Sequence, residues 1–300
     1  MKTIIIATIL SIFFPIVLSQ PAAAAISDYF VETSWLAQNL DQVTVVDVRV
    51  KPKYLLGHID GALHIDKNEF LSFRRGVKSL VPTVEEFQRL MIHYGITPET
   101  TVIVYAEHTN PYSARLVWTL KYYGHEKAYV LNGGYEKWAK EGRPLGFLPT
   151  KAVSIESYVV SDQEPIRAKA NEVLTSINDP GTIIWDVRRL TEFEGTEVRA
   201  DRGGHIPSAT HLNWTELLHE ENGIQVLKPA GELTVLLASH GITPDKKVIA
   251  HCQTGIRSAY ASLVLMALGY PEVRNYDGSW IEWANNRDLP IVTSSAAFSL

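Results

Sequence analysis

A single cysteine, Cys252, lies where the residue types and their spacing are best suited to chemistry. The apolar run before it ends at His251, and the short loop 252–257 leads directly into a strongly apolar helical pattern. Open α/β sheets bind their ligands at the carboxyl ends of parallel strands. The spacing therefore predicts a nucleophilic sulfur in a loop between a strand and a helix.

This loop has the features of an anion-binding cup. A tight turn before a helix N-terminus can direct several backbone N–H groups inward, and the helix adds roughly half a positive charge. Arg257 adds a full positive charge, and Gly255 lets the backbone curl. We therefore expect the pKa of Cys252 to be depressed. The alternatives are a small core residue for Cys252 and a surface charge for Arg257.

The chain repeats itself at four places in the same order. The offsets are 139, 147, 146 and 145 residues, measured from Asp47 to Asp186, His58 to His205, Gly95 to Gly241 and Gly133 to Gly278. Solenoid repeats are much shorter, at about 20 to 50 residues. A chain of 300 residues also suggests two domains. The sequence therefore predicts one domain present in two copies.

Each copy has the pattern of an α/β domain. Apolar runs rich in β-branched residues indicate buried parallel strands at 43–48, 101–105, 182–187 and 247–251. Helical patterns cover 82–94, 113–123, 230–240 and 258–268. Thr83 and Glu86 form a capping box at the start of the first helix, and Gly95 and Gly241 stand at expected C-caps. The alternation predicts a parallel sheet with helices on both faces in each copy.

The predicted segments are a signal peptide at 1–25, an N-terminal domain at 26–148, a linker at 149–168 and a C-terminal domain at 169–300. Lys2 precedes a stretch without charge, its apolar part at 4–18 is shorter than a membrane span, and small residues follow at 22–25. We expect cleavage near Ala25, a periplasmic or secreted location and no membrane contact afterwards. An uncleaved anchor is the alternative.

Composition excludes several classes of protein. With 46% hydrophobic and 20% charged residues, the chain has enough apolar material for packed cores. The net charge of −5 and the absence of a basic block argue against nucleic-acid binding. One cysteine allows neither an internal disulfide nor a multi-cysteine zinc site. The pairs His58 and His64, and His205 and His211, do not share a helix face, so we expect no metal.

The mature chain resembles the tandem rhodanese-domain sulfurtransferases over its whole length. Residues 273–283 are similar to the C-terminal signature of that family. Residues 54–62 resemble its N-terminal signature, with Asp60 where proline is usual, and residues 204–209 match that signature again, with Ser208 in place of glycine. The resemblance implies an α/β protein of two tandem rhodanese-like domains.

The resemblance also implies a mechanism. In the family, the loop cysteine attacks a sulfane sulfur and carries it as a persulfide, which the loop N–H groups stabilise. Here Cys252 would be the nucleophile. The substrate-binding residues would be Gln253, Thr254, Gly255, Ile256, Arg257, Ser258 and Arg188. Arg188 could instead be a structural partner of Asp186. Related phosphatases have a loop one residue longer, so the six residues 252–257 favour sulfur transfer.

The first copy lacks the nucleophile. Ala106 aligns with Cys252, and the following Glu107 would repel an anion. We therefore expect the N-terminal domain to be catalytically silent. A supporting role for it would place the active site near the domain interface.

These observations predict an enzyme that moves sulfur from thiosulfate to cyanide or a thiol acceptor. The expected partners are a small anionic sulfur donor and such an acceptor, and no cofactor is implied. A 3-mercaptopyruvate sulfurtransferase is one alternative, which is weakened because Glu192 stands where such members often have arginine. The others are a non-catalytic persulfide carrier and an arsenate or phosphate ester enzyme.

Overall fold

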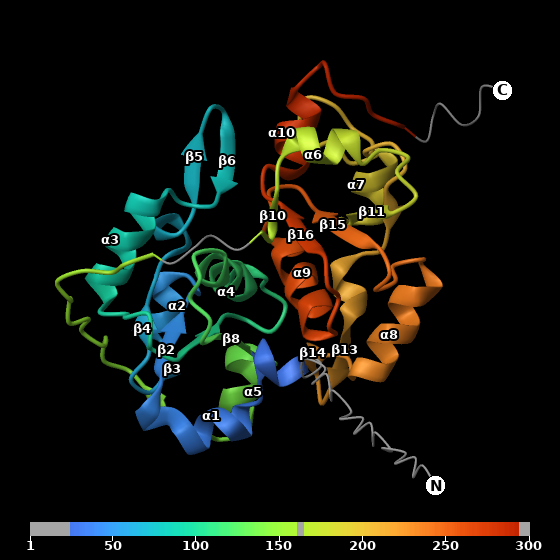
Figure 1. The fold of residues 1–300 in the computed structure, drawn as a ribbon. Coiled ribbons are helices and arrows are strands. Elements are labelled where there is room, and N and C mark those ends of the chain that lie inside the picture. The colour runs from blue at the N-terminus through green and yellow to red at the C-terminus, as the bar shows by residue number, and fades with distance from the viewer. Residues whose placement is uncertain (1–24, 161–164, 294–300) are drawn as a thin grey trace, which may run out of the picture.

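The chain forms two α/β domains of the same topology (Figure 1). The computed structural model describes residues 25–160 and 165–293. The predicted signal peptide therefore lies outside the described residues, apart from Ala25.

Each domain contains a five-stranded parallel sheet. The strand orders are β1-β8-β7-β2-β4 and β10-β16-β15-β11-β12. The first sheet consists of β1 (Phe30–Val31), β2 (Thr44–Asp47), β4 (Leu63–His64), β7 (Val102–Tyr105) and β8 (Ala128–Leu131). The second consists of β10 (Arg167–Ala168), β11 (Thr182–Asp186), β12 (Thr210–His211), β15 (Lys247–His251) and β16 (Val273–Tyr276). The identical orders confirm the predicted duplicated α/β fold.

Helices cover both faces of each sheet, as predicted. They are α1 (Thr33–Asn39), α2 (Lys51–Leu55), α3 (Val84–Tyr94), α4 (Tyr112–Tyr122), α5 (Gly134–Lys140), α6 (Ala170–Thr175), α7 (Leu190–Glu194), α8 (Ala230–Ser239), α9 (Arg257–Ala267) and α10 (Ser279–Asn285). Short 3-10 turns lie at Ile26–Asp28, Leu40–Gln42, Lys67–Glu69 and Trp214–Leu217. The predicted capping box opens α3, and Gly95 ends this helix in the left-handed conformation with φ of 66°.

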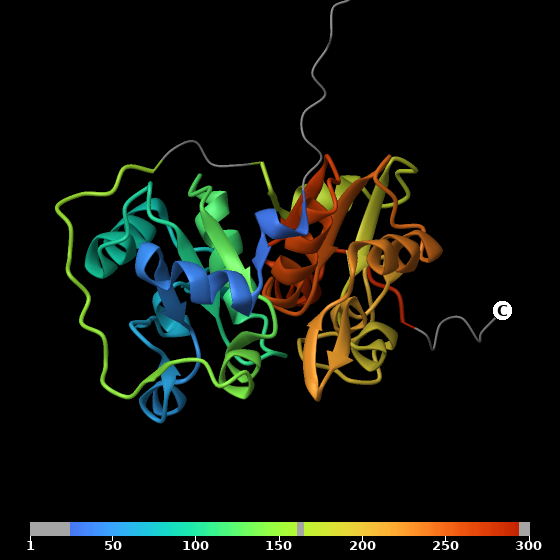
Figure 2. The same ribbon diagram turned by 90° about the horizontal axis from the view of Figure 1, so that it is seen from below.

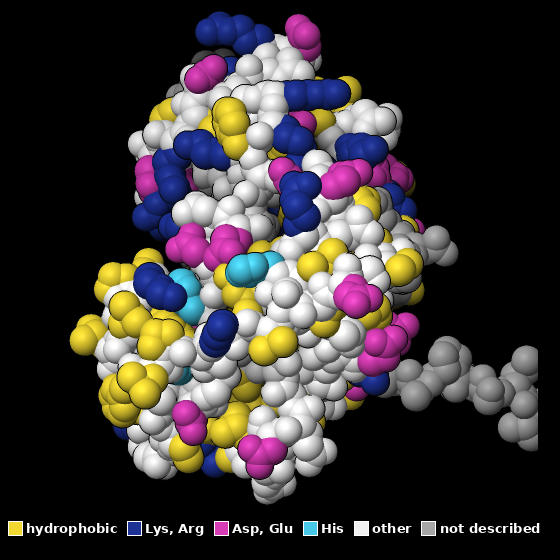
Figure 3. Space-filling view, turned by 90° about the vertical axis from the view of Figure 1, so that its left-hand side faces the viewer, with side chains coloured by type: hydrophobic (Ala, Val, Ile, Leu, Met, Phe, Trp, Pro, Cys, Tyr) yellow, Lys and Arg dark blue, Asp and Glu magenta, His cyan; other side chains and the backbone are white. Residues whose placement is uncertain are grey.

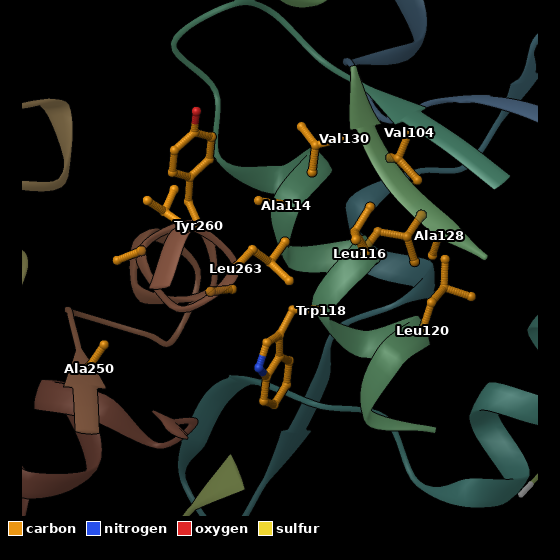
Figure 4. Packing of buried hydrophobic residues seen from close by; sticks show 14 of the residues in the cluster. Val104, Ala114, Leu116, Trp118, Leu120, Ala128, Val130, Ala250, Tyr260 and Leu263 are labelled. Atoms are coloured by element: carbon orange, nitrogen blue, oxygen red, sulfur yellow. The ribbon is translucent and has the colours of Figure 1, made fainter. Parts of the chain in front are cut away.

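The two domains pack through α4 and α9. One hydrophobic cluster contains buried residues of both domains, including Trp118 on α4 and Leu263 on α9. Figure 4 shows Leu263 and Tyr260 on the side of α9 that faces α4. Because the apolar core continues from one domain into the other, their relative position is fixed by close packing.

Each domain also extends a β-hairpin to the other domain. One hairpin pairs β5 (Ser72–Arg74) with β6 (Val77–Leu80), and the other pairs β13 (Leu218–Glu221) with β14 (Ile224–Leu227). Beside the first hairpin, the Val81 N–H donates to the Asp277 carboxylate at 3.0 Å. At the end of the second, the Leu227 N–H donates to Asn132 Oδ1 at 2.9 Å. The two domains thus exchange equivalent backbone contacts.

The segment between the domains follows the surface of the N-terminal domain (Figure 2). It begins after β9 (Leu145–Gly146), which forms a short antiparallel pair with β3 (His58–Ile59). The Ile155 N–H then donates to the Ile92 carbonyl at 3.1 Å, and Tyr158 packs edge-on against Phe87. Since β10 pairs with β16, the second sheet starts at Arg167, inside the predicted linker of 149–168.

Charged side chains of both signs share the surface. On the face shown in Figure 3, acidic side chains lie among the basic ones. Among the helices described, none has the length and apolar character needed to cross a membrane.

Candidate active site at Cys252

Cys252 follows β15, a strand in the interior of the second sheet, and lies five residues before α9 begins at Arg257. Its side chain is buried. Between these elements the chain turns at Gly255, whose φ is 75°. A Cβ atom there would lie 2.6 Å from the Asp277 carbonyl oxygen. Both the left-handed conformation and this close approach require glycine.

The carbonyl groups of the loop are held from outside. Trp280 N–H donates to the Cys252 carbonyl at 2.9 Å, and Ile281 N–H donates to the next carbonyl, that of Gln253, at 3.0 Å. The Gly255 carbonyl accepts from Asn275 Nδ2 at 3.0 Å and from Arg115 Nη1 at 3.1 Å. Because a trans peptide directs its C=O and N–H groups to opposite sides, these contacts also fix the directions of the loop N–H groups.

The surroundings of Cys252 favour the thiolate. Burial raises the pKa of its thiol, but the Arg257 guanidinium and the N–H groups of Thr254 and Ser258 lower it by more. The Ser258 hydroxyl also lies against the sulfur. The pKa of Cys252 is therefore below its ordinary value, in agreement with the expectation for a reactive cysteine.

Arg257 is bound to a carboxylate, which the sequence did not reveal. Its Nη1 and Nη2 atoms donate to Glu192 on α7 at 2.7 and 2.9 Å. Burial raises the pKa of Glu192, whereas Arg257 and then Arg189 lower it to about 2. Arg199 also donates to this carboxylate, at 3.1 Å. The cation beside the sulfur is thus fixed in place and partly neutralised by an ionised glutamate.

The other predicted loop residues differ in their burial and in their contacts. Gln253 is buried, and its Nε2 donates to the Arg199 carbonyl at 2.9 Å, while its Oε1 has no partner among the described residues. Ser258 Oγ donates to Asn275 Oδ1 at 2.7 Å. Ile256 is buried, and Thr254 is partly exposed. The loop therefore places the Thr254 and Ser258 N–H groups near the sulfur.

Arg188, predicted to bind substrate, is engaged elsewhere. Its guanidinium pairs with Asp186 at 2.6 Å and donates to the Gly204 carbonyl at 2.7 Å, with the side chain only 1% exposed. Arg49 makes the same two contacts, with Asp47 and the Gly57 carbonyl, in the domain that lacks a cysteine. Because the domain without a cysteine has the same pair of contacts, these contacts do not depend on the nucleophile. This supports a structural role for Arg188.

The corresponding loop of the N-terminal domain is built differently. It keeps one brace, since the Tyr135 N–H donates to the Ala106 carbonyl at 3.0 Å. Helix α4, however, begins six residues after Ala106, at Tyr112, so this loop is one residue longer than the Cys252 loop. Glu107 lies where Gln253 stands in the active loop, and it pairs with Lys53 at 2.7 Å. The first loop thus lacks the thiol, and its helix begins with a tyrosine where α9 begins with Arg257.

The histidine pairs have equivalent structural roles in the two domains. His58 and His205 contact the carbonyls of Tyr54 and Phe193 through Nδ1, both at 2.9 Å. Each histidine also stacks on the aromatic ring of that same residue. Within the described ranges, no group of three His, Cys, Asp or Glu side chains could hold a metal ion.

The sequence did not reveal the side chains that hold the loop in place, because they come from segments that are distant from the loop in the chain. They are Arg115, Glu192, Asn275, Asp277 and Ser279, the last of which accepts from the Cys252 N–H at 3.2 Å. Asn275, Asp277 and Ser279 lie within residues 273–283, the segment that resembles the C-terminal signature of the family, and this was the available signal. Nothing in the local sequence marks Arg115.

Comparison with known proteins identifies relatives for both domains. Residues 32–141 and 169–286 match the family described as "Rhodanese-like domain". A thiosulfate sulfurtransferase of Azotobacter vinelandii is 34% identical over 252 residues, covering 83% of this chain and 91% of the relative. One of Pseudomonas aeruginosa is 33% identical over 264 residues, covering 87% and 96%.

Two further similarities extend this comparison. The "Sulfur carrier protein TtuD" of Thermus thermophilus is 35% identical over 286 residues, covering 88% of this chain and 96% of the relative. Among solved structures, wild-type EanB has a TM-score of 0.80 at 23% identity, and the match covers 89% of this chain and 69% of that one. The structural match shows a shared fold.

Proposed function

The chain belongs to the family of rhodanese-like domain proteins, and on this premise we propose that it is a thiosulfate sulfurtransferase acting through a persulfide on Cys252. Two relatives at 33% and 34% identity are named thiosulfate sulfurtransferases. The nucleophile and its loop lie in the C-terminal domain. The N-terminal domain has Ala106 at the same position and supplies support.

In the first half-reaction, the Cys252 thiolate attacks the outer sulfur of thiosulfate. A bond forms between Sγ and that sulfur, the sulfur–sulfur bond of thiosulfate breaks, and its electron pair leaves with sulfite. The N–H groups of Thr254 and Ser258, together with Arg257, stabilise negative charge on the sulfur. The reaction is covalent catalysis by an activated cysteine.

In the second half-reaction, an acceptor nucleophile attacks the outer sulfur of the persulfide. Cyanide or a thiolate forms the new bond, and Cys252 leaves as a thiolate. The same N–H groups stabilise this leaving group. Because the chain has one cysteine, no second protein thiol can take the sulfur, and the acceptor must come from outside.

The observation that supports this proposal most strongly is a thiol of lowered pKa in a loop whose carbonyls are held outward. We expect thiosulfate treatment to add the mass of one sulfur atom to the protein, and cyanide to remove it. Cys252→Ser should show neither change, and Ala106→Ser is the matched control that should behave as the wild type. Full activity of Cys252→Ser would contradict the proposal.

We propose thiosulfate as the donor in preference to 3-mercaptopyruvate because of Glu192. This carboxylate is ionised and bound to the cation next to the sulfur. Family members that use 3-mercaptopyruvate often have arginine at this position, so the carboxylate of that donor would lack the cation that binds it. We expect kcat/KM to be larger for thiosulfate than for 3-mercaptopyruvate. The reverse order would identify a mercaptopyruvate sulfurtransferase.

A persulfide carrier is the second candidate, favoured by the relative named a sulfur carrier protein. Burial of Cys252 would protect a stored sulfur in the same loop. The two functions differ in the fate of the persulfide. A catalyst transfers it to cyanide over many turnovers, whereas a carrier keeps it until a protein acceptor is present. Single-turnover and steady-state rates with cyanide separate these cases.

We also propose that residues 1–25 direct export and that the mature enzyme works in the periplasm or outside the cell. The basis is the uncharged apolar stretch at 4–18 and the small residues at 22–25, a pattern that is typical of export signals. Cell fractionation followed by N-terminal sequencing tests this. A full-length chain in the cytoplasm would contradict it.

A further inference from the structure

A side chain of the silent domain, that of Arg115, hydrogen-bonds to the catalytic loop. This arginine lies in the first turn of α4, directly after the silent loop, and is fully buried. Its guanidinium donates to three acceptors: the Gly255 carbonyl at 3.1 Å, the Ser79 carbonyl at 2.9 Å and Asp277 Oδ1 at 2.6 Å. It therefore joins the catalytic loop, the β5–β6 hairpin and the segment after β16.

Asp277 fixes Arg115 in this position. Besides Arg115, the carboxylate accepts from the Val81 N–H at 3.0 Å and pairs with Arg167 at 3.2 Å. It is itself buried. A guanidinium held by a buried carboxylate and two carbonyls has little freedom to rotate. The Gly255 carbonyl therefore meets a donor whose place is determined by the contact between the domains.

The peptide that Arg115 holds lies at the turn of the loop. Gly255 is the left-handed residue at which the chain turns toward α9, and glycine has the widest choice of backbone conformations. Fixing its carbonyl also fixes the opposite-facing Ile256 N–H. The neighbouring Thr254 and Ser258 N–H groups lower the pKa of Cys252. Without Arg115, the side chain of Asn275 would hold this carbonyl alone among the described side chains.

The two domains have different residues at the position of Arg115, just as they have different residues in the loops that these side chains face. With an offset of 145 residues, which aligns Ser113-Ala114 with Ser258-Ala259, Arg115 corresponds to Tyr260. Tyr260 packs between Phe30 and Trp214 and lines a small cavity beside the silent loop. Helix α4 thus supplies a guanidinium to the loop that contains Cys252. Helix α9 supplies an aromatic ring to the loop that lacks a cysteine.

We propose that Arg115 of the silent domain is a positioning residue that holds the Cys252 loop in its sulfur-binding conformation. The inference rests on the proposed role of Cys252 as nucleophile. It gives the silent domain a specific task in catalysis, beyond covering apolar surface.

Two substitutions separate positioning from stability. Arg115→Met removes all three hydrogen bonds, whereas Arg115→Lys keeps a positive charge for Asp277 but cannot span the three acceptors. We expect Arg115→Lys to recover most of the thermal stability lost in Arg115→Met. Both should lower kcat/KM for thiosulfate by about 10- to 100-fold, the effect expected of misplaced catalytic groups. Asn132→Ala removes the counterpart of the Asp277–Val81 contact, beside the silent loop, and should keep wild-type kcat/KM.

The decisive measurement is the rate of Cys252 alkylation by iodoacetamide as a function of pH. As Cys252 is the only thiol, the signal needs no correction, and it does not depend on thiosulfate activity. We expect the midpoint to move to higher pH in Arg115→Lys and to stay in place in Asn132→Ala. A folded Arg115→Lys with wild-type midpoint and kcat/KM would overturn the inference. If Arg115→Met does not fold, Arg115→Lys alone decides. Wild-type protein that alkylates normally but transfers no sulfur would instead refute the proposed function.

Discussion

The two domains share a scaffold and differ in the loop that follows the equivalent strands β7 and β15. Both keep the same sheet order, the same buried Asp–Arg pair and the same backbone contact to an exchanged hairpin. The loops differ in length, in the residue at the strand end and in the sign of the nearby charge. A duplicated fold can therefore retain its packing fully while chemistry depends on a few loop residues.

The silent copy also contacts the catalytic loop. The side of α4 that faces the catalytic loop supplies Arg115, whereas the corresponding side of α9 supplies Tyr260. The interface is symmetric in its apolar packing and asymmetric in its polar contacts. We interpret this asymmetry as division of labour: one domain has the nucleophile, and the other holds its loop.

The largest expected effect comes from moving the thiol between the two loops. Cys252→Ala should lower kcat by about 10⁴-fold or more, because the nucleophile is lost. Adding Ala106→Cys to this variant should not restore activity. The longer silent loop and Glu107 do not offer the same cup. Steady-state sulfur transfer to cyanide measures both effects.

The control for this experiment is Ala106→Cys alone. It should keep wild-type activity and add a second thiol that alkylates at higher pH than Cys252. Recovery of more than a small fraction of activity in the double variant would show that the scaffold, and not the loop, determines the chemistry.

A smaller effect is expected when the cation beside the sulfur is removed. Arg257 lowers the pKa of Cys252, so Arg257→Ala should raise that pKa and reduce the thiolate present at neutral pH. We expect KM for thiosulfate to rise and kcat/KM to fall by about 10- to 100-fold. Lys53→Ala removes the cation beside the silent loop and serves as the matched control. An unchanged KM in Arg257→Ala would remove this arginine from donor binding.

Glu192→Gln should change the pKa of Cys252 and the KM for thiosulfate in the direction opposite to Arg257→Ala, and by a smaller amount. Loss of the carboxylate leaves more of the Arg257 charge for the sulfur, so the pKa of Cys252 should fall further. We expect KM for thiosulfate to decrease a few-fold, and discrimination against 3-mercaptopyruvate to decrease as well. Kinetics with both donors measure the change. A rise in KM would indicate that Glu192 acts by positioning Arg257 and not by neutralising it.

The lowered pKa of Glu192 predicts that the folded protein loses stability in acid. Its pKa in the folded protein is about 2, below the ordinary value of 4.5. A group with a lowered folded pKa contributes stability above its ordinary pKa, and this contribution is lost as pH falls from about 4.5 toward 2. Because solvent screens part of the interaction, this contribution is less than about 3 kcal/mol. Urea unfolding at several acidic pH values should show a shallower pH dependence for Glu192→Gln. Equal slopes would contradict the assigned pKa.

Sequence patterns were sufficient for the fold and for the position of Cys252 between β15 and α9. Strand, helix and cap signals are local, so the duplicated α/β arrangement, the Thr83–Glu86 capping box and the place of Cys252 could be predicted. The contacts that complete the site join residues far apart in the chain. Arg115 and Gly255 are 140 positions apart, and Arg257 and Glu192 are 65 apart. No local periodicity encodes such pairs, because they form only when the two domains and α7 have packed.

Glu107→Gln is expected to have the smallest effect, and it tests whether the silent loop has lost all influence on catalysis. Glu107 is ionised, because Lys53 and Asn110 lower its pKa by more than burial raises it. Its ion pair with the largely exposed Lys53 should contribute less than about 1 kcal/mol to the free energy of unfolding. Thermal unfolding and kcat/KM should therefore both stay close to the wild type. A marked fall in kcat/KM with unchanged stability would mean that the silent loop acts on the catalytic loop through Arg115, which lies in the first turn of the helix that follows it.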